Sequence, residues 1–261
     1  MCSLSAPPPH LSVVIPAFNE ARRLPATLER IQTFLLARRM SAEILVVADG
    51  STDGTAAVVD AMAGLPGGVP LRVLANPVNR GKGYAVTQGV FHARGERILM
   101  SDADLSTPIQ ELERLASWLD RGWKIAIGSR VLPGPREVRR SGRRALIAQV
   151  FNWLASRIAL SGFSDTQCGF KLFESEAART IFSRLTIDRF AFDVEVLAIA
   201  KILEYPVAEV PVAWYEDPDS RVHMLRDSLG MVRDLFRIRA QLRSKAYLAE
   251  SGKRKHNVSC R

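Results

Sequence analysis

Hydrophobic and polar residues alternate along the first half of the chain in blocks that predict strands and helices in turn. The predicted strands are short β-branched or aliphatic runs at residues 11–15, 43–48, 71–74, 97–100 and 124–127. The predicted helices carry apolar side chains at helical spacing and lie at residues 21–40, 55–63, 83–93 and 112–119. This alternation is typical of a mainly parallel sheet covered by helices on both faces, so we expect an α/β fold.

The second half of the chain is less regular and predicts mostly helices. These are expected at residues 144–158, 175–185, 194–203 and 224–246, with one more strand at residues 207–214. The last helix has Leu225, Leu229, Val232 and Phe236 at helical spacing beside several arginines, which predicts an amphipathic helix. We expect a single domain over residues 11–246 between flexible ends at residues 1–10 and 247–261.

The composition excludes several classes of protein. With 47% hydrophobic and 24% charged residues, the chain of 261 residues has none of the signature of disorder. Its three cysteines fit neither a disulfide framework nor a zinc pattern, which favours reduced thiols in a cytosolic protein. No run of apolar residues is long enough to span a bilayer, and no signal peptide is expected.

Positive charge is concentrated in the second half of the chain. Residues 1–132 hold 14 Lys and Arg against 12 Asp and Glu, whereas residues 133–261 hold 22 against 15. Such a balance predicts an anionic partner: phosphates, nucleic acid or an acidic membrane surface. The basic helix at residues 224–246 favours attachment to an anionic membrane surface, although a helix packed on the sheet with a solvated basic face fits the same pattern.

Two carboxylates at the end of a predicted strand indicate a metal site. Asp102 and Asp104 directly follow the strand at residues 97–100 and could bind Mg²⁺ or Mn²⁺, or merely cap a polar turn. The loops at residues 49–55 and 79–83 also follow strands and suit either phosphate recognition or ordinary turns. Neither the dinucleotide fingerprint nor the P-loop pattern is present. Because ligands bind at the carboxyl ends of parallel strands, we expect these groups to share one cleft.

Four motifs together resemble a known family. The segments at residues 16–20 (PAFNE), 49–55 (DGSTDGT), 79–83 (NRGKG) and 102–104 (DAD) are similar, in order, to the motifs of inverting family-two glycosyltransferases. That family has the Rossmann-like fold called GT-A. Four later segments narrow the resemblance to the dolichyl-phosphate β-glucosyltransferases, in the group of polyprenyl-phosphate hexose synthases: residues 128–130 (GSR), 165–171 (DTQCGFK), 192–195 (FDVE) and 219–222 (DSRV).

The resemblance implies an activity and a set of site residues. It implies transfer of a hexose, glucose from UDP-glucose, to dolichyl or polyprenyl phosphate with Mg²⁺ or Mn²⁺. Residues 11–132 would form the nucleotide and metal half, and residues 133–246 the sugar and acceptor half. The implied nucleotide-sugar contacts are Pro16, Asn19, Glu20, Asp49, Lys82, Asp102 and Arg221, and the implied metal ligands are Asp102 and Asp104. The acceptor-phosphate contacts would be Arg130, Gln167 and Lys171, and the catalytic residues Asp104, Arg130, Asp193 and Glu195.

Parts of the same sequence fit other functions. A family-two enzyme that glycosylates a saccharide would share the first four motifs. A protein that only binds nucleotide sugar is suggested by Ala48, which stands where the family usually has a second acidic residue. A nucleic-acid binder is disfavoured, because acidic cleft motifs repel a polyanion and no aromatic platform accompanies the basic residues. The eukaryotic glucosyl enzymes carry an N-terminal membrane anchor; none is expected here, so we expect a cytoplasmic protein peripheral on the cytoplasmic face of a membrane.

Overall fold

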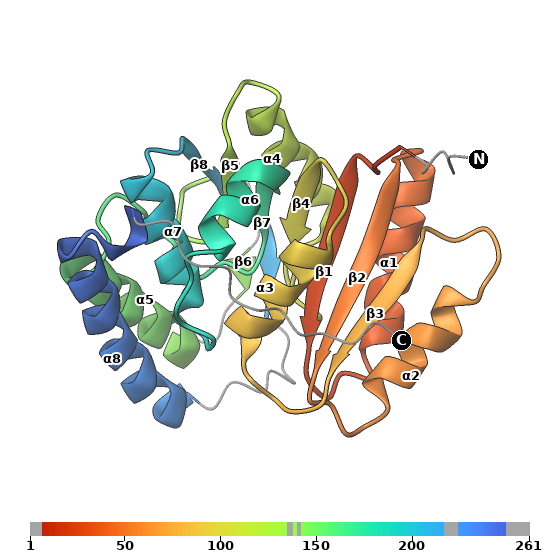
Figure 1. The fold of residues 1–261 in the computed structure, drawn as a ribbon, viewed down its shortest axis with the longest axis horizontal. Helices are drawn as coiled ribbons and strands as arrows, with labels where there is room; N and C mark the ends of the chain where they lie inside the picture. Colours follow the sequence, from red (N-terminus) through yellow and green to blue (C-terminus); the bar gives the residue numbers. More distant parts are fainter. Residues whose placement is uncertain (1–6, 135–137, 140–141, 217–223, 249–261) are drawn as a thin grey trace.

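The structure is a computed structural model that describes residues 7–134, 138–139, 142–216 and 224–248. Arg221 and the chain ends at residues 1–6 and 249–261 lie outside the described residues. The described strands form a seven-stranded sheet of order β3-β2-β1-β4-β7-β5-β8 and a small sheet of β6 and β9 (Figure 1). The strands are β1 (Leu11–Ala17), β2 (Ala42–Asp49), β3 (Leu71–Asn76), β4 (Arg97–Met100), β5 (Ile125–Ser129), β6 (Val138–Arg139), β7 (Lys171–Glu174), β8 (Val207–Pro211) and β9 (Trp214–Tyr215).

Helices cover both faces of the large sheet, as the sequence predicts (Figure 1). One face packs against α1 (Leu24–Ala37), α2 (Thr55–Ala63) and α4 (Leu112–Leu119), the last preceded by the short helix η1 (Ile109–Glu111). The other face packs against α3 (Lys82–His92), α6 (Ser175–Phe182) and α7 (Phe192–Ile202). Alternation along β1 divides these two cores, because Val13 and Ile15 face the first group of helices and Val14 the second.

Strand β7 was not predicted from the sequence, yet it completes the sheet. It lies between β4 and β5 and runs antiparallel to both. Its first residue, Lys171, pairs with Met100 at the end of β4 and with Ile127 in β5. Because β7 runs in the opposite direction, its beginning meets the carboxyl ends of β4 and β5. The sheet therefore brings a buried lysine to the edge where the acidic motif begins.

The two remaining long helices, α5 (Gly142–Ile158) and α8 (Met224–Arg243), pack on one another at the left of Figure 1. The apolar stripe predicted for α8 is partly wrong: Leu235 and Ile238 are buried, whereas Phe236 is 55% exposed. The side chains of residues 224–229 lie outside those described. The face of α8 that is buried depends on its contacts with α5 and α7, and the spacing of apolar residues in the sequence did not identify this face. Among the described residues, no helix combines the length and hydropathy that a bilayer span requires.

Candidate active site at the carboxyl edge of the sheet

The carboxylate of Asp49 anchors the loop that follows β3. It is buried at the end of β2, where it accepts hydrogen bonds from Nδ2 of Asn76 at 2.9 Å and from the backbone N–H groups of Arg80 and Gly81 at 3.0 and 2.7 Å. If Asp49 contacted a nucleotide, its carboxylate would bind the nucleotide in addition to these three donors. Asp49 thus fixes the loop that carries Lys82 into the first turn of α3.

The motif after β1 is tied to the neighbouring loop. Pro16 lies within β1, and Asn19 adopts a left-handed backbone conformation with φ of 56°. The N–H of Asn19 donates to Oγ of Ser51 at 3.0 Å. Glu20 is buried and forms an ion pair with Arg23. The strand ends of β1 and β2 are therefore joined by side-chain contacts, and their loops lie together as predicted.

Asp102 forms the centre of the acidic motif. Nζ of Lys82 lies 2.6 Å from Oδ1 of Asp102. On its other side Asp102 packs on Gly169, where an added Cβ would lie only 1.9 Å from Oδ2. Asp104 is partly exposed, and its Oδ1 accepts a hydrogen bond from the N–H of Ser106 at 3.0 Å. Glycine at position 169 is thus required for Asp102 to occupy its place.

The pKa values of the two carboxyls differ because their surroundings differ. Burial alone would raise the pKa of Asp102, but the positive charges of Lys82, Lys171 and Arg130 outweigh it and lower the pKa. Burial and the negative charge of Asp102 raise the pKa of Asp104. Asp102 is therefore held ionised, whereas the charge of Arg23 and the hydrogen bonds from Ser106 do not outweigh the effects that raise the pKa of Asp104.

A fully buried ion pair lies beside these carboxylates. Nζ of Lys171 contacts Oδ1 of Asp193 in the first turn of α7 and donates to the carbonyl oxygen of Cys168 at 2.6 Å. Lys171 is 1% exposed and Asp193 is 3% exposed. Water cannot replace either partner at such burial, so the two charges depend on one another.

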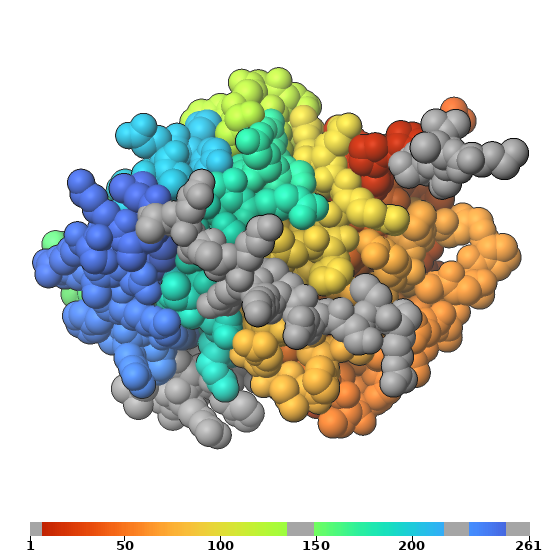
Figure 2. Space-filling model, in the orientation of Figure 1, coloured from red at the N-terminus to blue at the C-terminus, as the bar shows by residue number. Residues whose placement is uncertain are grey.

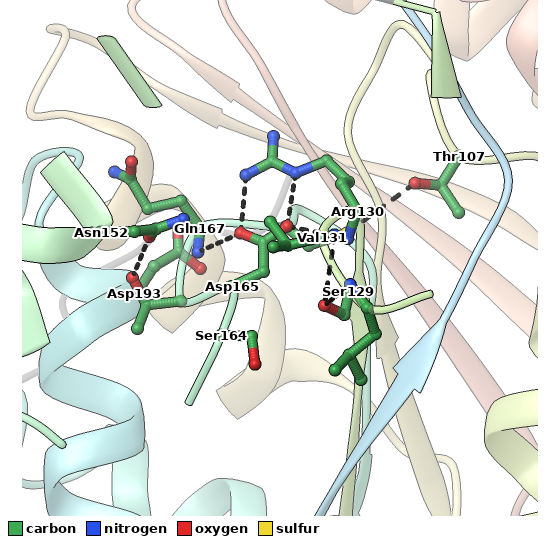
Figure 3. A network of polar contacts seen from close by, with 12 residues as sticks. Thr107, Ser129, Arg130, Val131, Asn152, Ser164, Asp165, Gln167 and Asp193 are labelled. Atoms are coloured by element: carbon green, nitrogen blue, oxygen red, sulfur yellow. Dashed lines mark hydrogen bonds and ion pairs between the residues drawn. The ribbon is translucent and has the colours of Figure 1, made fainter. Parts of the chain in front are cut away.

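Arg130, which is partly buried, forms a second ion pair with the fully buried Asp165 (Figure 3). Nε and Nη2 of Arg130 donate to the two oxygens of Asp165 at 2.7 and 2.8 Å, and the backbone N–H of Arg130 adds a third bond at 2.9 Å. Burial would raise the pKa of Asp165, but the charge and hydrogen bonds of Arg130 lower it well below its usual range. The guanidinium also lies 5.7 Å from the ring centroid of Trp214. The backbone N–H of Gln167 donates to Asp165 at 3.2 Å, which brings this predicted residue to the same place.

We call the seven charged residues of this edge the charge cluster: Lys82, Arg130, Lys171, Asp102, Asp104, Asp165 and Asp193. Three cations face four carboxylates, so the cluster carries one net negative charge. A divalent cation would reverse that sign and allow an anionic ligand to enter.

Glu195 does not join the cluster. It is fully buried, and its oxygens accept hydrogen bonds from Thr186, Ile187 and Tyr247. It lies two residues after Asp193 in α7, and residues at that spacing point to different sides of a helix. The structure therefore corrects the expected place of Glu195 beside the sugar and gives it a structural role.

The donor set at Asp102 and Asp104 fits a hard divalent cation. Asp102 and Asp104 both carry carboxylates, and burial together with the charge of Asp102 raises the pKa of Asp104. Among the described residues, no group of three or more His, Cys, Asp or Glu side chains is arranged to hold a metal. The ion would thus need further oxygen ligands from a substrate, which is the usual arrangement for Mg²⁺ with phosphates.

Sequence reasoning gave no role to Asp165 or Gly169, although both lie in the motif at residues 165–171. The sequence offers one signal for an ion pair here: Asp165 is the acidic residue of one motif, and Arg130 is the basic residue of another. Arg130 and Asp165 can pair because β5 and the loop before β7 lie next to each other. The sequence did not reveal this proximity, because β7 was not predicted.

This chain is similar in sequence to known dolichyl-phosphate β-glucosyltransferases. Dolichyl-phosphate β-glucosyltransferase of Homo sapiens is 38% identical, with 94% of this chain and 79% of that protein covered. Its counterpart in Saccharomyces cerevisiae is 34% identical, with 88% and 74% covered. Among solved structures, glucosyl-3-phosphoglycerate synthase of Mycobacterium tuberculosis matches with a TM-score of 0.65 at 20% identity, covering 94% of this chain and 82% of that one. The structural likeness confirms the predicted GT-A fold.

The sequence profile described as Glycosyl transferase family 2 matches residues 12–182. This stretch contains the four strand-end motifs and also the pairs Arg130–Asp165 and Lys82–Asp102. Motif order, sheet topology and sequence similarity agree, and the chain belongs to glycosyl transferase family 2.

Proposed function

We propose that this chain transfers glucose from UDP-glucose, with inversion, to dolichyl phosphate or another polyprenyl phosphate. Two cations, the buried Lys171 and the partly buried Arg130, lie beside the carboxylate of Asp102, and this arrangement carries the proposal. The names of the human and yeast relatives agree with it. The M. tuberculosis neighbour was crystallised with Mn²⁺ and UDP-glucose, which supports a donor of this kind.

The donor would bind at the ends of β1, β2 and β4. Asp102 and Asp104 would hold Mg²⁺ or Mn²⁺, which neutralises charge developing on the departing diphosphate. Lys82 stands in the first turn of α3, where a cation and the helix dipole both favour phosphate. The nucleoside would be bound by the neighbouring residues Pro16, Asn19, Glu20 and Asp49, with Arg221 as a further donor contact.

The acceptor would be bound by charge and needs little base catalysis. A phosphate monoester has a second pKa of about 6, so it is mostly a dianion at neutral pH and already nucleophilic. Arg130, Lys171 and Gln167 would position it for attack on the anomeric carbon. Asp193 keeps the Lys171 ammonium in place, and the Arg130–Asp165 bond uses two of the five N–H groups of the guanidinium.

Donor and acceptor specificity can be tested in one assay. Purified protein with Mn²⁺ is given UDP-glucose labelled in the sugar, and either dolichyl phosphate, dolichol or a soluble disaccharide. Of the three acceptors, only dolichyl phosphate should receive glucose, because only its phosphate can be bound by Arg130 and Lys171. Faster transfer to the disaccharide would refute the lipid acceptor and favour the saccharide alternative.

We also propose peripheral attachment to the cytoplasmic face of a membrane through α5 and α8. Trp153 on α5 and Phe236 on α8 are 58% and 55% exposed, and each has an arginine on the same helix nearby. Arg157 lies 5.9 Å from the Trp153 ring, and α8 forms a large part of the molecular surface in Figure 2. Exposed aromatic side chains beside arginines are typical of helices that lie in an anionic interface.

The test of attachment is sedimentation with liposomes at low salt. Wild-type protein should sediment with phosphatidylserine vesicles and not with phosphatidylcholine vesicles, and the double variant W153A/F236A should sediment less. Leu36, which is 50% exposed on α1 at the other side of the sheet, gives the control L36A. Equal sedimentation of W153A/F236A and L36A would refute this surface.

A further inference from the structure

Glu195 is a buried carboxylate outside the charge cluster that binds four hydrogen-bond donors. The backbone N–H groups of Thr186 and Ile187 donate at 3.0 and 2.8 Å, and the hydroxyl of Thr186 donates at 2.7 Å. The fourth donor is the hydroxyl of Tyr247 at 2.8 Å. Tyr247 is 2% exposed and belongs to the short helix η2 (Ala246–Leu248) after α8. Glu195 therefore joins the segment at residues 186–189 to the end of the described chain.

The 186–189 segment supports the loop that carries Lys82. The N–H of Tyr84 donates to the carbonyl oxygen of Asp188 at 3.0 Å. A Cβ added at Gly81 would lie 2.5 Å from that same oxygen, and one at Gly83 would lie 2.8 Å from the carbonyl oxygen one residue before. Both glycines flank Lys82, so backbone contact with the segment sets the position of the lysine.

The C-terminal part of the chain also contacts this segment and the residues just before it. Nε of Arg184 donates to the carbonyl oxygen of Tyr247 at 3.0 Å, and Nε2 of Gln241 on α8 lies 3.4 Å from the hydroxyl of Thr186. A continuous series of contacts therefore runs from η2 through Glu195 to the loop of Lys82. Its other end is Asp102 in the acidic motif.

We infer that Tyr247 is a positioning residue for nucleotide-sugar binding, because its hydroxyl holds Glu195 and the 186–189 segment, which in turn holds Lys82 against Asp102. The inference rests on the proposed function, in which Lys82 contacts the donor phosphates. Removing the hydroxyl leaves a buried carboxylate with one donor fewer and loosens the segment. Donor affinity should fall, while the acceptor cations Arg130 and Lys171 keep their own partners.

The experiment compares Tyr247→Phe with Tyr205→Phe. Tyr205 packs against the same apolar cluster beyond the other end of α7, so its variant controls for loss of a tyrosine hydroxyl. With Mn²⁺ present, Y247F should raise the Kd of UDP in calorimetry and the KM for UDP-glucose by about fivefold or more. The kcat and the KM for polyprenyl phosphate should stay within about twofold, as the acceptor contacts are unchanged. Y205F should match wild type.

A lower kcat with unchanged donor Kd and KM would overturn the inference, because a merely structural role reduces the active fraction and not donor affinity. Glu195→Gln supplies a second variant: adding Y247F to E195Q should weaken UDP binding by less than Y247F does alone, and full additivity would also count against the inference. If wild type binds UDP but transfers no glucose to polyprenyl phosphate, the proposed function fails. The comparison of Kd values still decides the role of Tyr247.

Discussion

The substitution Asp165→Asn tests the ion pair between Asp165 and Arg130. Asp165 is 0% exposed and accepts three hydrogen bonds from Arg130. Asparagine has nearly the same shape but offers an N–H₂ group where one carboxylate oxygen accepted, so a guanidinium is left buried and uncompensated. Breaking such a pair costs about 3 to 5 kcal/mol of unfolding free energy. For a chain of this size that corresponds to a fall in Tm of about 6 to 20 °C.

The assay is thermal and urea unfolding followed by circular dichroism. Glu113→Gln is the control, because its ion pair with Arg38 is half exposed on both sides and its loss should leave the midpoint unchanged. The pKa of Asp165 is lowered in the folded state, so the unfolded state binds the proton first as the pH falls. The stabilisation by the Asp165 carboxylate is thus complete above pH about 5 and is lost progressively below the unfolded pKa of about 3.9. At pH 3.5 the gap between wild type and D165N should have narrowed by about 0.7 kcal/mol. A gap below about 1 kcal/mol at pH 7, or one that widens on acidification, would refute the role of this pair.

Two further substitutions test the acidic motif. Lys82→Gln removes the cation beside Asp102, so Mn²⁺ measured by electron paramagnetic resonance without nucleotide should bind roughly five- to tenfold more tightly, while UDP-glucose binds more weakly. Weaker Mn²⁺ binding by K82Q would contradict the assignment of Lys82. Gly169→Ala would place a Cβ 1.9 Å from the Asp102 carboxylate, so transfer and Mn²⁺ binding should both fall sharply. Gly230→Ala on α8, where an added Cβ meets no atom within 4 Å, should leave both unchanged, and equal activity of the two variants would show that the Asp102 contact is unimportant.

Much of the fold, and the place of the motifs at the strand ends, could be predicted because the information is local. β-Branched runs ended by glycine, aspartate or proline marked β1, β2, β3 and β4, and helical spacing marked the helices between them. In a parallel sheet the carboxyl ends of such strands share an edge, so Asp49 and Asp102 were expected to lie in one cleft. The parallel pairing of β1 with β2 and with β4 agrees with this topology, which follows from the order of elements.

The surroundings of Arg130 and Lys171 depend on topology that the local pattern did not contain. Strand β7 has only four residues, and it begins with Lys171 and ends with Glu174, so no run of apolar residues predicted a strand there. It also runs antiparallel to its neighbours. Because β7 was not predicted, the ion pair between Arg130 and Asp165 could not be predicted either. Glu195 was placed in the cleft because its motif was treated as a unit, whereas helix geometry turns it away from Asp193.

The position of Ala48 can now be interpreted in physical terms. Ala48 is buried in β2 and precedes Asp49, so the two side chains point to opposite faces of the strand. The bonds from Asp49 to Arg80 and Gly81 are complete without a second carboxylate. Ala48 therefore leaves the loop of Lys82 intact, which supports a working transferase over a protein that only binds nucleotide sugar.

In the proposed function, Asp102 and Asp104 hold a divalent ion that enables the nucleotide diphosphate to depart. The most direct measurement is single-turnover transfer from labelled UDP-glucose to polyprenyl phosphate by wild type and by Asp104→Asn, at saturating Mn²⁺ and after chelation. With Mn²⁺, transfer by D104N should be about 100-fold slower or more than transfer by wild type, and chelation should stop transfer by wild type. Transfer by D104N within about twofold of wild type, or full wild-type activity after chelation, would contradict this role of the ion.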